Sequence, residues 1–180
     1  MQGDVRDLPG LTEAARGCDK GIHLAVRAHP FHASEVIDVN VSGAFNFITA
    51  ARQHRFRNAI LAGSAPVHLD VIDQRHLMPT AADEDHQCDL SKVLQEVIVQ
   101  DIHAHGMSAM CLRFGHIVRG ELEQKLSIPI PLSKFDYCRA GWIAIEDMVT
   151  ACVAALEQPP DHICQSIINM SPDGHYSLSF

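Results

Sequence analysis

The sequence lacks the features that mark membrane, secreted and nucleic-acid-binding proteins. No apolar run approaches the roughly 18 residues that a membrane-spanning helix needs, and Met1 to Asp4 form neither the basic nor the apolar part of a signal peptide. Acidic residues outnumber basic ones by 22 to 14, which gives a formal net charge of −8, and no basic stripe offsets that balance. We therefore expect a cytoplasmic protein that binds neither membranes nor nucleic acid.

Disulfide patterns and metal-ligand clusters are also missing. No C-x-x-C pair occurs, and the six cysteines are scattered, several in apolar segments, at positions 18, 88, 111, 138, 152 and 164. This pattern favours reduced cysteines over a disulfide framework. The twelve histidines include the close pairs His29/His32 and His103/His105. Neither pair has a third ligand at a spacing known for zinc, so we expect no metal site.

The sequence does contain alternating short apolar runs and amphipathic segments. Strands are predicted for 21–26, 58–63, 108–114 and 163–170, and helices for 11–17, 34–54, 89–105 and 145–157. Gly17 is expected to close the first helix and Ser34 to cap the second. The apolar face of the second helix carries Val36, Ile37, Val41, Phe45 and Ile48. Segments 65–87 and 119–141, both with prolines, are predicted as a loop and an irregular region.

Strands separated by helices of this length predict right-handed βαβ crossovers and a parallel sheet. The run Asn58–Gly63 is apolar on both faces, as expected for a strand inside such a sheet. The sequence shows neither an internal repeat nor a second apolar core. Residues 1–180 are therefore predicted to form a single α/β domain.

The strongest chemical signal is a serine at a strand end followed by a lysine near the start of a helix. Ser64 ends the run Ala59–Ser64, and Lys92 lies in the first turn of the helix expected from Asp89. A hydroxyl and an ammonium in these positions are typical of a proton-transfer site. Cys88, four residues before Lys92, lies on the same helix face, so its thiol is a candidate for the same site.

Seven fragments extend this pattern along almost the whole chain. They are G-D-V-R-D at 3–7, I-H-L-A at 22–25, N-V-S-G at 40–43, A-G-S-A-P-V-H at 62–68, C-D-L-S-K at 88–92, L-R-F-G-H-I-V-R-G at 112–120 and W-I-A-I-E-D-M at 142–148. In order and spacing they resemble the extended short-chain dehydrogenase/reductases, specifically the NAD-dependent epimerase/dehydratase family acting on nucleotide sugars. The resemblance implies a Rossmann-like parallel sheet with helices on both faces, NAD or NADP as cofactor and a small-molecule substrate.

Five matching residues are implied to contact the cofactor. By resemblance, Asp4 would face the adenine, Leu24 and Ala25 would lie beside the dinucleotide, Asn40 would hydrogen-bond near it, and Lys92 would hold the nicotinamide ribose. Simpler interpretations stay open for three of them. Asp4 could be a turn residue, Asn40 could satisfy nearby helix backbone, and Lys92 could lie on the helix surface.

The implied reaction site contains Ser64, which would orient a substrate carbonyl or simply cap a turn, and Cys88 at the position of the family's catalytic tyrosine. The cysteine side chain ends well short of a phenol oxygen, so we expect impaired chemistry. His68 and His116 would face the substrate, or form hydrogen bonds with backbone in partly exposed loops. Residues 119–141 leave little room for a substrate-binding subdomain. We therefore expect the substrate-binding region, about 119–180, to be smaller than that of the family.

The family's first βα unit, with its G-x-x-G-x-x-G turn, has no counterpart in these 180 residues. We therefore expect a sheet truncated at the N-terminus and poor binding of NAD(P) by this chain alone. Two functions stay open: an oxidoreductase or isomerase with impaired activity, and a non-catalytic nucleotide-sensing or protein-interaction module. A homodimer is expected through the helices near 35–53 and 89–105, as the resemblance implies.

Overall fold

The computed structural model describes residues 2–27, 32–64, 84–120, 142–160 and 167–170. In this part of the chain the main sheet has four parallel strands in the order β1-β2-β3-β6, which span Lys20–His23, Asn58–Ser64, Ala109–Phe114 and Ile167–Met170. A second parallel pair joins β4 to β5, which span His116–Val118 and Trp142–Ala144. The parallel pairing confirms the α/β fold predicted from the alternating pattern.

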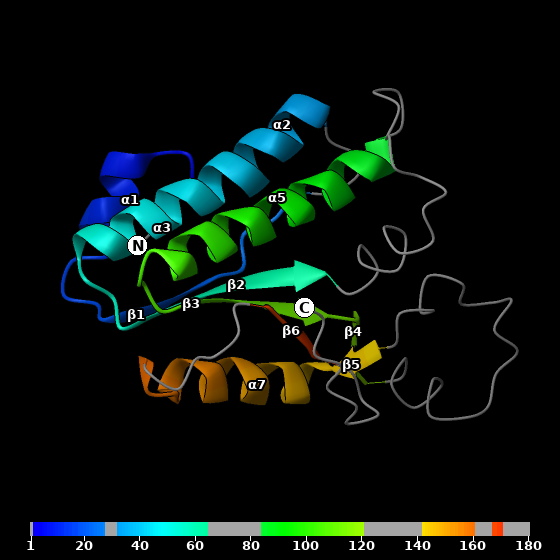
Figure 1. Cartoon of the computed structure of the whole chain (residues 1–180). Coiled ribbons are helices and arrows are strands. Elements are labelled where there is room, and N and C mark those ends of the chain that lie inside the picture. Colours follow the sequence, from blue (N-terminus) through cyan, green and yellow to red (C-terminus); the bar gives the residue numbers. More distant parts are fainter. Residues whose placement is uncertain (1, 28–31, 65–83, 121–141, 161–166, 171–180) are drawn as a thin grey trace, which may run out of the picture.

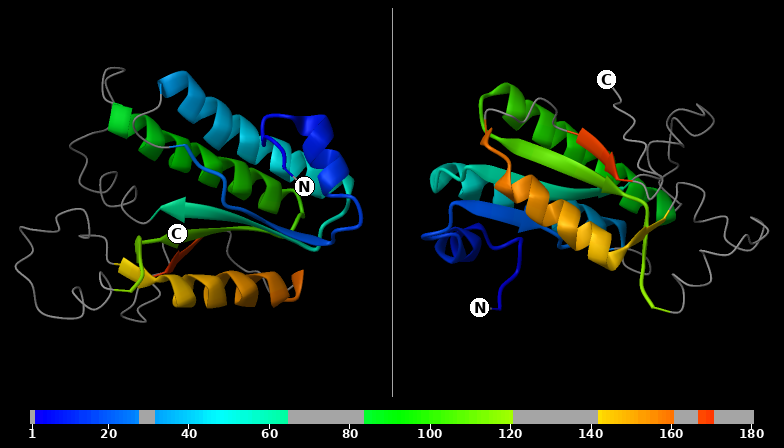
Figure 2. Two further views of the ribbon diagram at one scale, coloured as in Figure 1. Left: turned by 180° about the vertical axis from the view of Figure 1, so that it is seen from behind. Right: turned by 90° about the horizontal axis from the view of Figure 1, so that it is seen from below.

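Helices cover both faces of the main sheet (Figures 1 and 2). On one face lie α1, α2, η1, α3 and α5, which span Leu8–Ala14, Ala33–Ile37, Asp38–Ser42, Gly43–Gln53 and Glu84–Ala104. On the other face lies α7, Ile145–Glu157. The arrangement is the Rossmann-like one that the resemblance implied. No helix within the described ranges is long and apolar enough to cross a membrane.

Two clusters of buried residues hold the layers together. The cluster between the sheet and the α3/α5 layer includes Phe47, Ile48, Phe56, Leu61 and Val99. The cluster on the α7 face includes Ile60, Met110, Leu112, Phe114 and Ile143. Successive residues of β2 and β3 point into alternate clusters. Both faces of these strands are therefore buried, which explains their predominantly apolar sequences.

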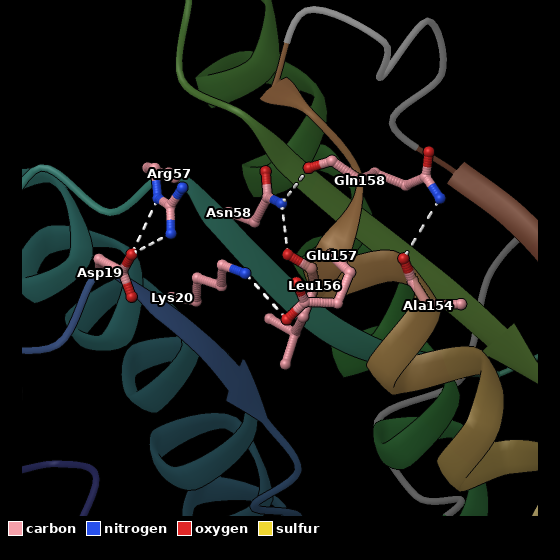
Figure 3. A network of polar contacts seen from close by, with 8 residues as sticks. All are labelled: Asp19, Lys20, Arg57, Asn58, Ala154, Leu156, Glu157 and Gln158. Carbon is pink, nitrogen blue, oxygen red and sulfur yellow. Dashed lines mark hydrogen bonds and ion pairs between the residues drawn. The ribbon is translucent and has the colours of Figure 1, made fainter.

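The last turn of α7 is fastened to the sheet by Asn58, the first residue of β2 (Figure 3). The Asn58 amide nitrogen donates to the carbonyl oxygens of Leu156 at 2.8 Å and Gln158 at 2.7 Å. Carbonyl groups at a helix C-terminus have no partner within the helix. Asn58 therefore caps α7 and fixes it at the amino ends of the strands.

The first helix starts earlier than the sequence predicts. It begins at Leu8 because Asp7 caps it, with a carboxylate oxygen that accepts a hydrogen bond from the Gly10 amide at 3.2 Å. Gly17, predicted to close this helix, lies three residues beyond its end with a φ of +78°. The glycine therefore shapes the loop that leads into β1.

The second helical run contradicts two predictions. It begins at Ala33 with His32 as its N-cap residue, so Ser34 lies inside the first turn and does not cap it. Phe45, predicted on the buried face, is 57% exposed. The reason is the π-helical turn Asp38–Ser42 between α2 and α3. A π turn holds more residues than an α turn, so one 3.6-residue period does not describe the whole run.

The other elements lie close to their predicted ranges, and α7 spans the predicted residues Ile145–Glu157. The strand predicted for 21–26 is shorter, at Lys20–His23, and the helix predicted from Asp89 begins at Glu84. Strands β4 and β5 were not predicted, because each has only three residues. Most of the segments 65–87 and 119–141 lies outside the described residues.

Candidate functional site

Lys92 connects helix α5 to the carboxyl end of β2. Its Nζ donates hydrogen bonds to the Ala62 carbonyl oxygen at 2.8 Å and to Gln95 Oε1 at 3.2 Å. Ala62 lies two residues before Ser64, the half-buried last residue of β2. Lys92 therefore lies beside the strand end that carries Ser64, at the edge of the sheet where open α/β folds bind ligands.

Burial lowers the pKa of Lys92 below its usual value, while the nearby thiols of Cys111 and Cys88 act in the opposite direction. A lysine ammonium has three N–H donors. Two of them are directed at Ala62 and Gln95. No acceptor for the third N–H lies among the described residues.

Cys88 is half-buried and lies one helical turn before Lys92. Its Sγ is 3.9 Å from the carbonyl oxygen of Arg27, in the segment that follows β1. The Cys88 carbonyl oxygen accepts a hydrogen bond from Ser91 Oγ at 2.6 Å. The thiol is therefore close to the carboxyl end of β1 and to the first turns of α5.

Asn40 ties the segment after β1 to α5. Its side chain is fully buried within η1 and accepts a hydrogen bond from the Arg27 amide at 2.7 Å. The amide nitrogen of Asn40 donates to the Arg27 carbonyl at 2.9 Å and to Ser91 Oγ at 2.8 Å. Both N–H donors are thus used within the protein. The Asn40 side chain therefore links the segment after β1 to α5 through hydrogen bonds.

Gln95 and Ser91 are site residues that the sequence analysis missed. Gln95 is fully buried, and its side chain donates to the Asn40 backbone carbonyl at 2.6 Å while accepting from Lys92. Ser91, also fully buried, bonds Asn40 and Cys88. The available signal was spacing, because a polar residue three positions after Lys92 lies on the same helix face.

His23 is a second buried polar group near Lys92. Its ring is 5% exposed and stacks on Phe47 with the ring centroids 5.6 Å apart. Burial, together with the positive charge of Lys92, lowers its pKa to about 4. Its Nε2 is buried without a hydrogen-bond partner among the described residues. The imidazole is therefore neutral at pH 7.

The residues predicted to contact the cofactor lie in different surroundings. The Asp4 carboxylate is exposed and bonds the Arg6 guanidinium, with the shortest contact at 2.6 Å. These hydrogen bonds with Arg6 lower the pKa of Asp4 to about 2. Leu24 and Ala25 directly follow β1, and Leu24 is 51% exposed. They lie at the carboxyl end of the sheet, as Ser64 does.

The histidines predicted to face the substrate are only partly described. His68 lies outside the described residues, and His116 begins β4 next to Trp142 of β5. Across the described ranges, no group of three or more His, Cys, Asp or Glu residues could hold a metal ion.

A buried ion pair joins the middle of α5 to β3. Arg113 Nε and a terminal guanidinium nitrogen donate to the two carboxylate oxygens of Glu96 at 2.6 and 2.7 Å. Arg113 is 5% exposed and Glu96 is 8% exposed. This pairing raises the pKa of Arg113. It fixes α5, and so Lys92 one turn earlier, against the sheet.

The chain was compared with family sequence models, with characterised proteins and with solved structures. A sequence model of the NAD dependent epimerase/dehydratase family matches residues 1–132. The L-arabinose 1-dehydrogenase (NAD(P)(+)) of Haloferax volcanii is 28% identical over 195 residues, which cover 98% of this chain and 76% of that protein.

Solved structures share the fold. A short-chain dehydrogenase/reductase superfamily protein from Agrobacterium tumefaciens with bound NAD has a TM-score of 0.66 at 18% identity, covering 95% of this chain and 65% of that one. UDP-glucose-4-epimerase from Stenotrophomonas maltophila, with NAD and formylated UDP-arabinopyranose, has a TM-score of 0.67 at 18% identity, with coverage of 95% and 62%.

The chain thus spans less than two thirds of these solved structures. The family match nevertheless covers most of its length, and it contains Asn40, Ser64, Cys88 and Lys92. The chain belongs to the NAD-dependent epimerase/dehydratase family.

Proposed function

We propose that this chain forms the reaction site of an NAD(P)-dependent oxidoreductase or isomerase with impaired activity. The observation that carries the proposal is the 2.8 Å hydrogen bond between Lys92 Nζ and the Ala62 carbonyl. It holds an ammonium group beside the strand end that bears Ser64. The relatives include an L-arabinose dehydrogenase and a UDP-sugar epimerase, which supports a nucleotide sugar or a similar carbinol as substrate.

The residues of this chain fit the nicotinamide end of a dinucleotide but not its pyrophosphate end. The remaining N–H of Lys92 can donate to a ribose hydroxyl, and Leu24 and Ala25 lie at the carboxyl end of β1. The 180 residues contain no G-x-x-G-x-x-G turn whose amides could approach a pyrophosphate. NAD or NADP, which supplies a hydride acceptor when bound, would therefore be held weakly by this chain alone.

Asp4 and Asn40 have more limited roles in this proposal. Asp4 would accept a hydrogen bond from an adenine amino group only if its bonds with Arg6 leave an oxygen lone pair free. Asn40 has no N–H left for a ligand because Arg27 and Ser91 use both. We propose that Asn40 positions the backbone around the cofactor and does not contact it through its amide nitrogen.

At the substrate end, Ser64 and Cys88 would do the chemistry. The Ser64 hydroxyl would donate to the substrate oxygen, and the substrate's hydroxyl proton would need an acceptor within about 2.6–3.2 Å or through one water. A cysteine side chain is shorter than a tyrosine by a phenyl ring, so transfer to Cys88 would run through a bridging water. This is the reason to propose impaired activity. His68 and His116 remain predicted substrate contacts.

The second candidate is a non-catalytic nucleotide-sensing or protein-interaction module. It is favoured by Cys88, because a thiol stands where the family has its catalytic tyrosine. That thiol lies beside the Arg27 carbonyl. A calorimetric titration with NAD⁺ and NADP⁺, joined to a turnover assay with L-arabinose and with UDP-glucose, distinguishes the two. We expect weak binding and slow turnover that Lys92→Met abolishes and that Lys20→Met, at the opposite end of the sheet, leaves unchanged.

Three results would change this conclusion. A low-micromolar dissociation constant would contradict weak binding of the dinucleotide by this chain. Turnover that survives Lys92→Met would remove Lys92 from the site. Measurable dinucleotide binding without any turnover, in the wild type and in Cys88→Tyr, would favour the non-catalytic module.

We further propose that one domain of residues 1–180 forms a homodimer in the cytoplasm through the helices near 35–53 and 89–105. The support is an apolar side chain exposed on each helix: Phe45 on α3 is 57% exposed and Val97 on α5 is 53% exposed. The two helices lie side by side on the outer face (Figures 1 and 2). Sedimentation should show a dimer that Val97→Lys dissociates and Val153→Lys on α7 does not. A monomer at high concentration would refute the dimer.

A further inference from the structure

Lys92 lies half-buried on α5 without a carboxylate partner among the described residues. The carboxylate one helical turn further on, that of Glu96, is bound through both oxygens by the Arg113 guanidinium at 2.6 and 2.7 Å. Because Arg113 already neutralises this carboxylate, Glu96 does not act as a counter-ion for Lys92. Burying an ammonium group without a counter-ion is costly, so these surroundings favour the neutral amine.

The hydrogen bonds of Lys92 match those of a neutral amine. An ammonium group has three N–H donors, whereas a neutral amine has two N–H donors and one lone pair. Lys92 Nζ meets two acceptors, the Ala62 carbonyl at 2.8 Å and Gln95 Oε1 at 3.2 Å. The orientation of the Gln95 amide is fixed because its Nε2 donates to the Asn40 carbonyl at 2.6 Å. Gln95 therefore presents an acceptor to Lys92, and the two acceptors satisfy both N–H groups of the neutral amine.

Titratable groups act on Lys92 from three elements, and two of these groups carry no charge at pH 7. Burial lowers the pKa of His23 on β1 to about 4 and raises the pKa of Cys111 on β3 to about 12. The third group, Cys88 on α5, would favour the ammonium form only as a thiolate. Burial itself lowers the pKa of Lys92. His23 and Cys111 do not compensate for that burial, so a larger fraction of this lysine than usual is neutral.

The carboxyl end of β2 brings a hydroxyl group close to this amine. Ala62, which bonds Lys92, lies two residues before Ser64, and open α/β folds bind ligands at this edge of the sheet. We propose that Lys92 acts there as a nucleophile that forms an imine with a small aldehyde. A desolvated lysine is the form that reacts with carbonyl compounds. This activity goes beyond the proposed function because it needs neither a dinucleotide nor a hydride transfer.

The reaction is balanced without an oxidant or a reductant. The Nζ lone pair attacks the carbonyl carbon, and the electron pair of the C=O π bond moves to the oxygen, which takes up a proton. Nζ releases one proton, and the product is a carbinolamine. Loss of the hydroxyl group together with the second Nζ proton gives the C=N bond and one molecule of water. The Ser64 hydroxyl, at the end of β2, is the candidate donor to the carbonyl oxygen during the attack.

The test exposes the full chain to glycolaldehyde and sodium cyanoborohydride without dinucleotide, so that each imine is reduced to a stable secondary amine. Peptide mass mapping then compares the four lysines, at positions 20, 92, 125 and 134. Lys20 is the matched reference, because its ammonium pairs with Glu157 at 2.9 Å and its side chain is 20% exposed (Figure 3). At pH 7 Lys92 should be labelled at least about tenfold faster than Lys20, since each unit of pKa difference changes the neutral fraction about tenfold.

The pH dependence gives a second readout on the unmodified sequence. From pH 7 upward the labelling rate of Lys20 should rise about tenfold per pH unit. The labelling rate of Lys92 should level off at a lower pH, because its amine becomes fully neutral earlier. Equal rates at pH 7, or a parallel rise at both lysines, would overturn the proposal.

The variant Gln95→Glu tests the role of the matched acceptors. A carboxylate at this position would supply a counter-ion, so labelling of Lys92 at pH 7 should fall at least about tenfold while that of Lys20 stays unchanged. Undiminished labelling in a variant that circular dichroism shows to be folded would overturn the proposal. If the variant does not fold, the comparison of Lys92 with Lys20 in the unmodified chain decides alone.

The outcome can be separated from that of the proposed function. Turnover with the dinucleotide but without labelling at Lys92 would retain the oxidoreductase or isomerase and overturn only the imine chemistry. Labelling at Lys92 without any turnover would support the imine chemistry and count against the proposed reaction.

Discussion

Replacing Asn40 by alanine is expected to destabilise the fold even when no dinucleotide is present. The side chain is fully buried and makes three hydrogen bonds, two with the Arg27 backbone and one with Ser91 Oγ, at distances of 2.7–2.9 Å. Alanine removes all three at once. Because these bonds connect η1 to both the β1 end and α5, their loss should be felt in the free energy of unfolding.

The size of the effect follows from the number and burial of these bonds. A buried hydrogen bond contributes about 1 kcal/mol net, so Asn40→Ala should cost about 3 kcal/mol. Asn40→Asp keeps the shape and the acceptor for the Arg27 amide, but it removes both N–H donors and brings a carboxylate toward the Arg27 carbonyl. We therefore expect Asn40→Asp to cost at least as much, about 3 kcal/mol.

The assay is urea unfolding followed by circular dichroism without dinucleotide, with the slope m checked for change. Asn46→Ala is the matched control, since the Asn46 amide donates to the carbonyls of Val5 at 3.0 Å and Arg6 at 3.1 Å in a partly exposed position. Water can replace those bonds, so its cost should be about 1 kcal/mol or less. If Asn40→Ala lowers the free energy of unfolding no more than Asn46→Ala does, the hydrogen bonds of Asn40 are not what stabilises this region.

Two further predictions concern other buried polar groups. The pKa of His23 near 4 lies below that of an unfolded histidine, so only the unfolded chain gains this proton as pH falls from about 6.5 toward 4, and stability should fall by up to about 3 kcal/mol. Urea midpoints at pH 7 and 5 should show this loss reduced in His23→Phe; an equal loss in the variant would rule out His23 as its source. Arg113→Met should cost about 3–5 kcal/mol because it leaves the buried Glu96 carboxylate without its ion-pair partner. The double variant with Glu96→Leu should recover most of that loss in the same assay, and failure to recover would refute the explanation.

The sheet and the order of the helices could be predicted because strands that are buried on both faces consist mostly of apolar residues. Every residue of Asn58–Leu61 and Ala109–Phe114 is buried, so these strands appear as nearly continuous apolar runs, broken only by Asn58 at the start of β2 and by Arg113 in β3. The helix Ile145–Glu157 could be predicted to the residue because it packs one stripe on the sheet. The π turn Asp38–Ser42 could not be predicted, because a changed helical period leaves no mark in residue types.

The buried polar residues of the site were harder to predict than the residues at the ends of its strands and helices. Lys92 and Ser64 could be predicted because a serine at a strand end followed by a lysine near a helix start is typical of a proton-transfer site, and both lie in fragments that resemble the family. Gln95 and Glu96 look like ordinary helix-surface residues in sequence, yet both are buried. Their burial depends on which partners the folded chain supplies, the Asn40 carbonyl and the Arg113 guanidinium, and those partners come from elements distant in sequence.

The bonds around Lys92 also bear on which residues report activity. Gln95 bonds both Lys92 and the Asn40 carbonyl, and these residues also bond the backbone of β2 and of the segment after β1 without any ligand. Losing any of them would disturb the fold, so their presence is explained by stability whether or not the protein is an enzyme. Cys88 differs, because its thiol makes a weak 3.9 Å hydrogen bond to the Arg27 carbonyl and lies at the position that the resemblance assigns to a catalytic tyrosine. Loss of catalytic function would therefore be visible at position 88 rather than at Lys92.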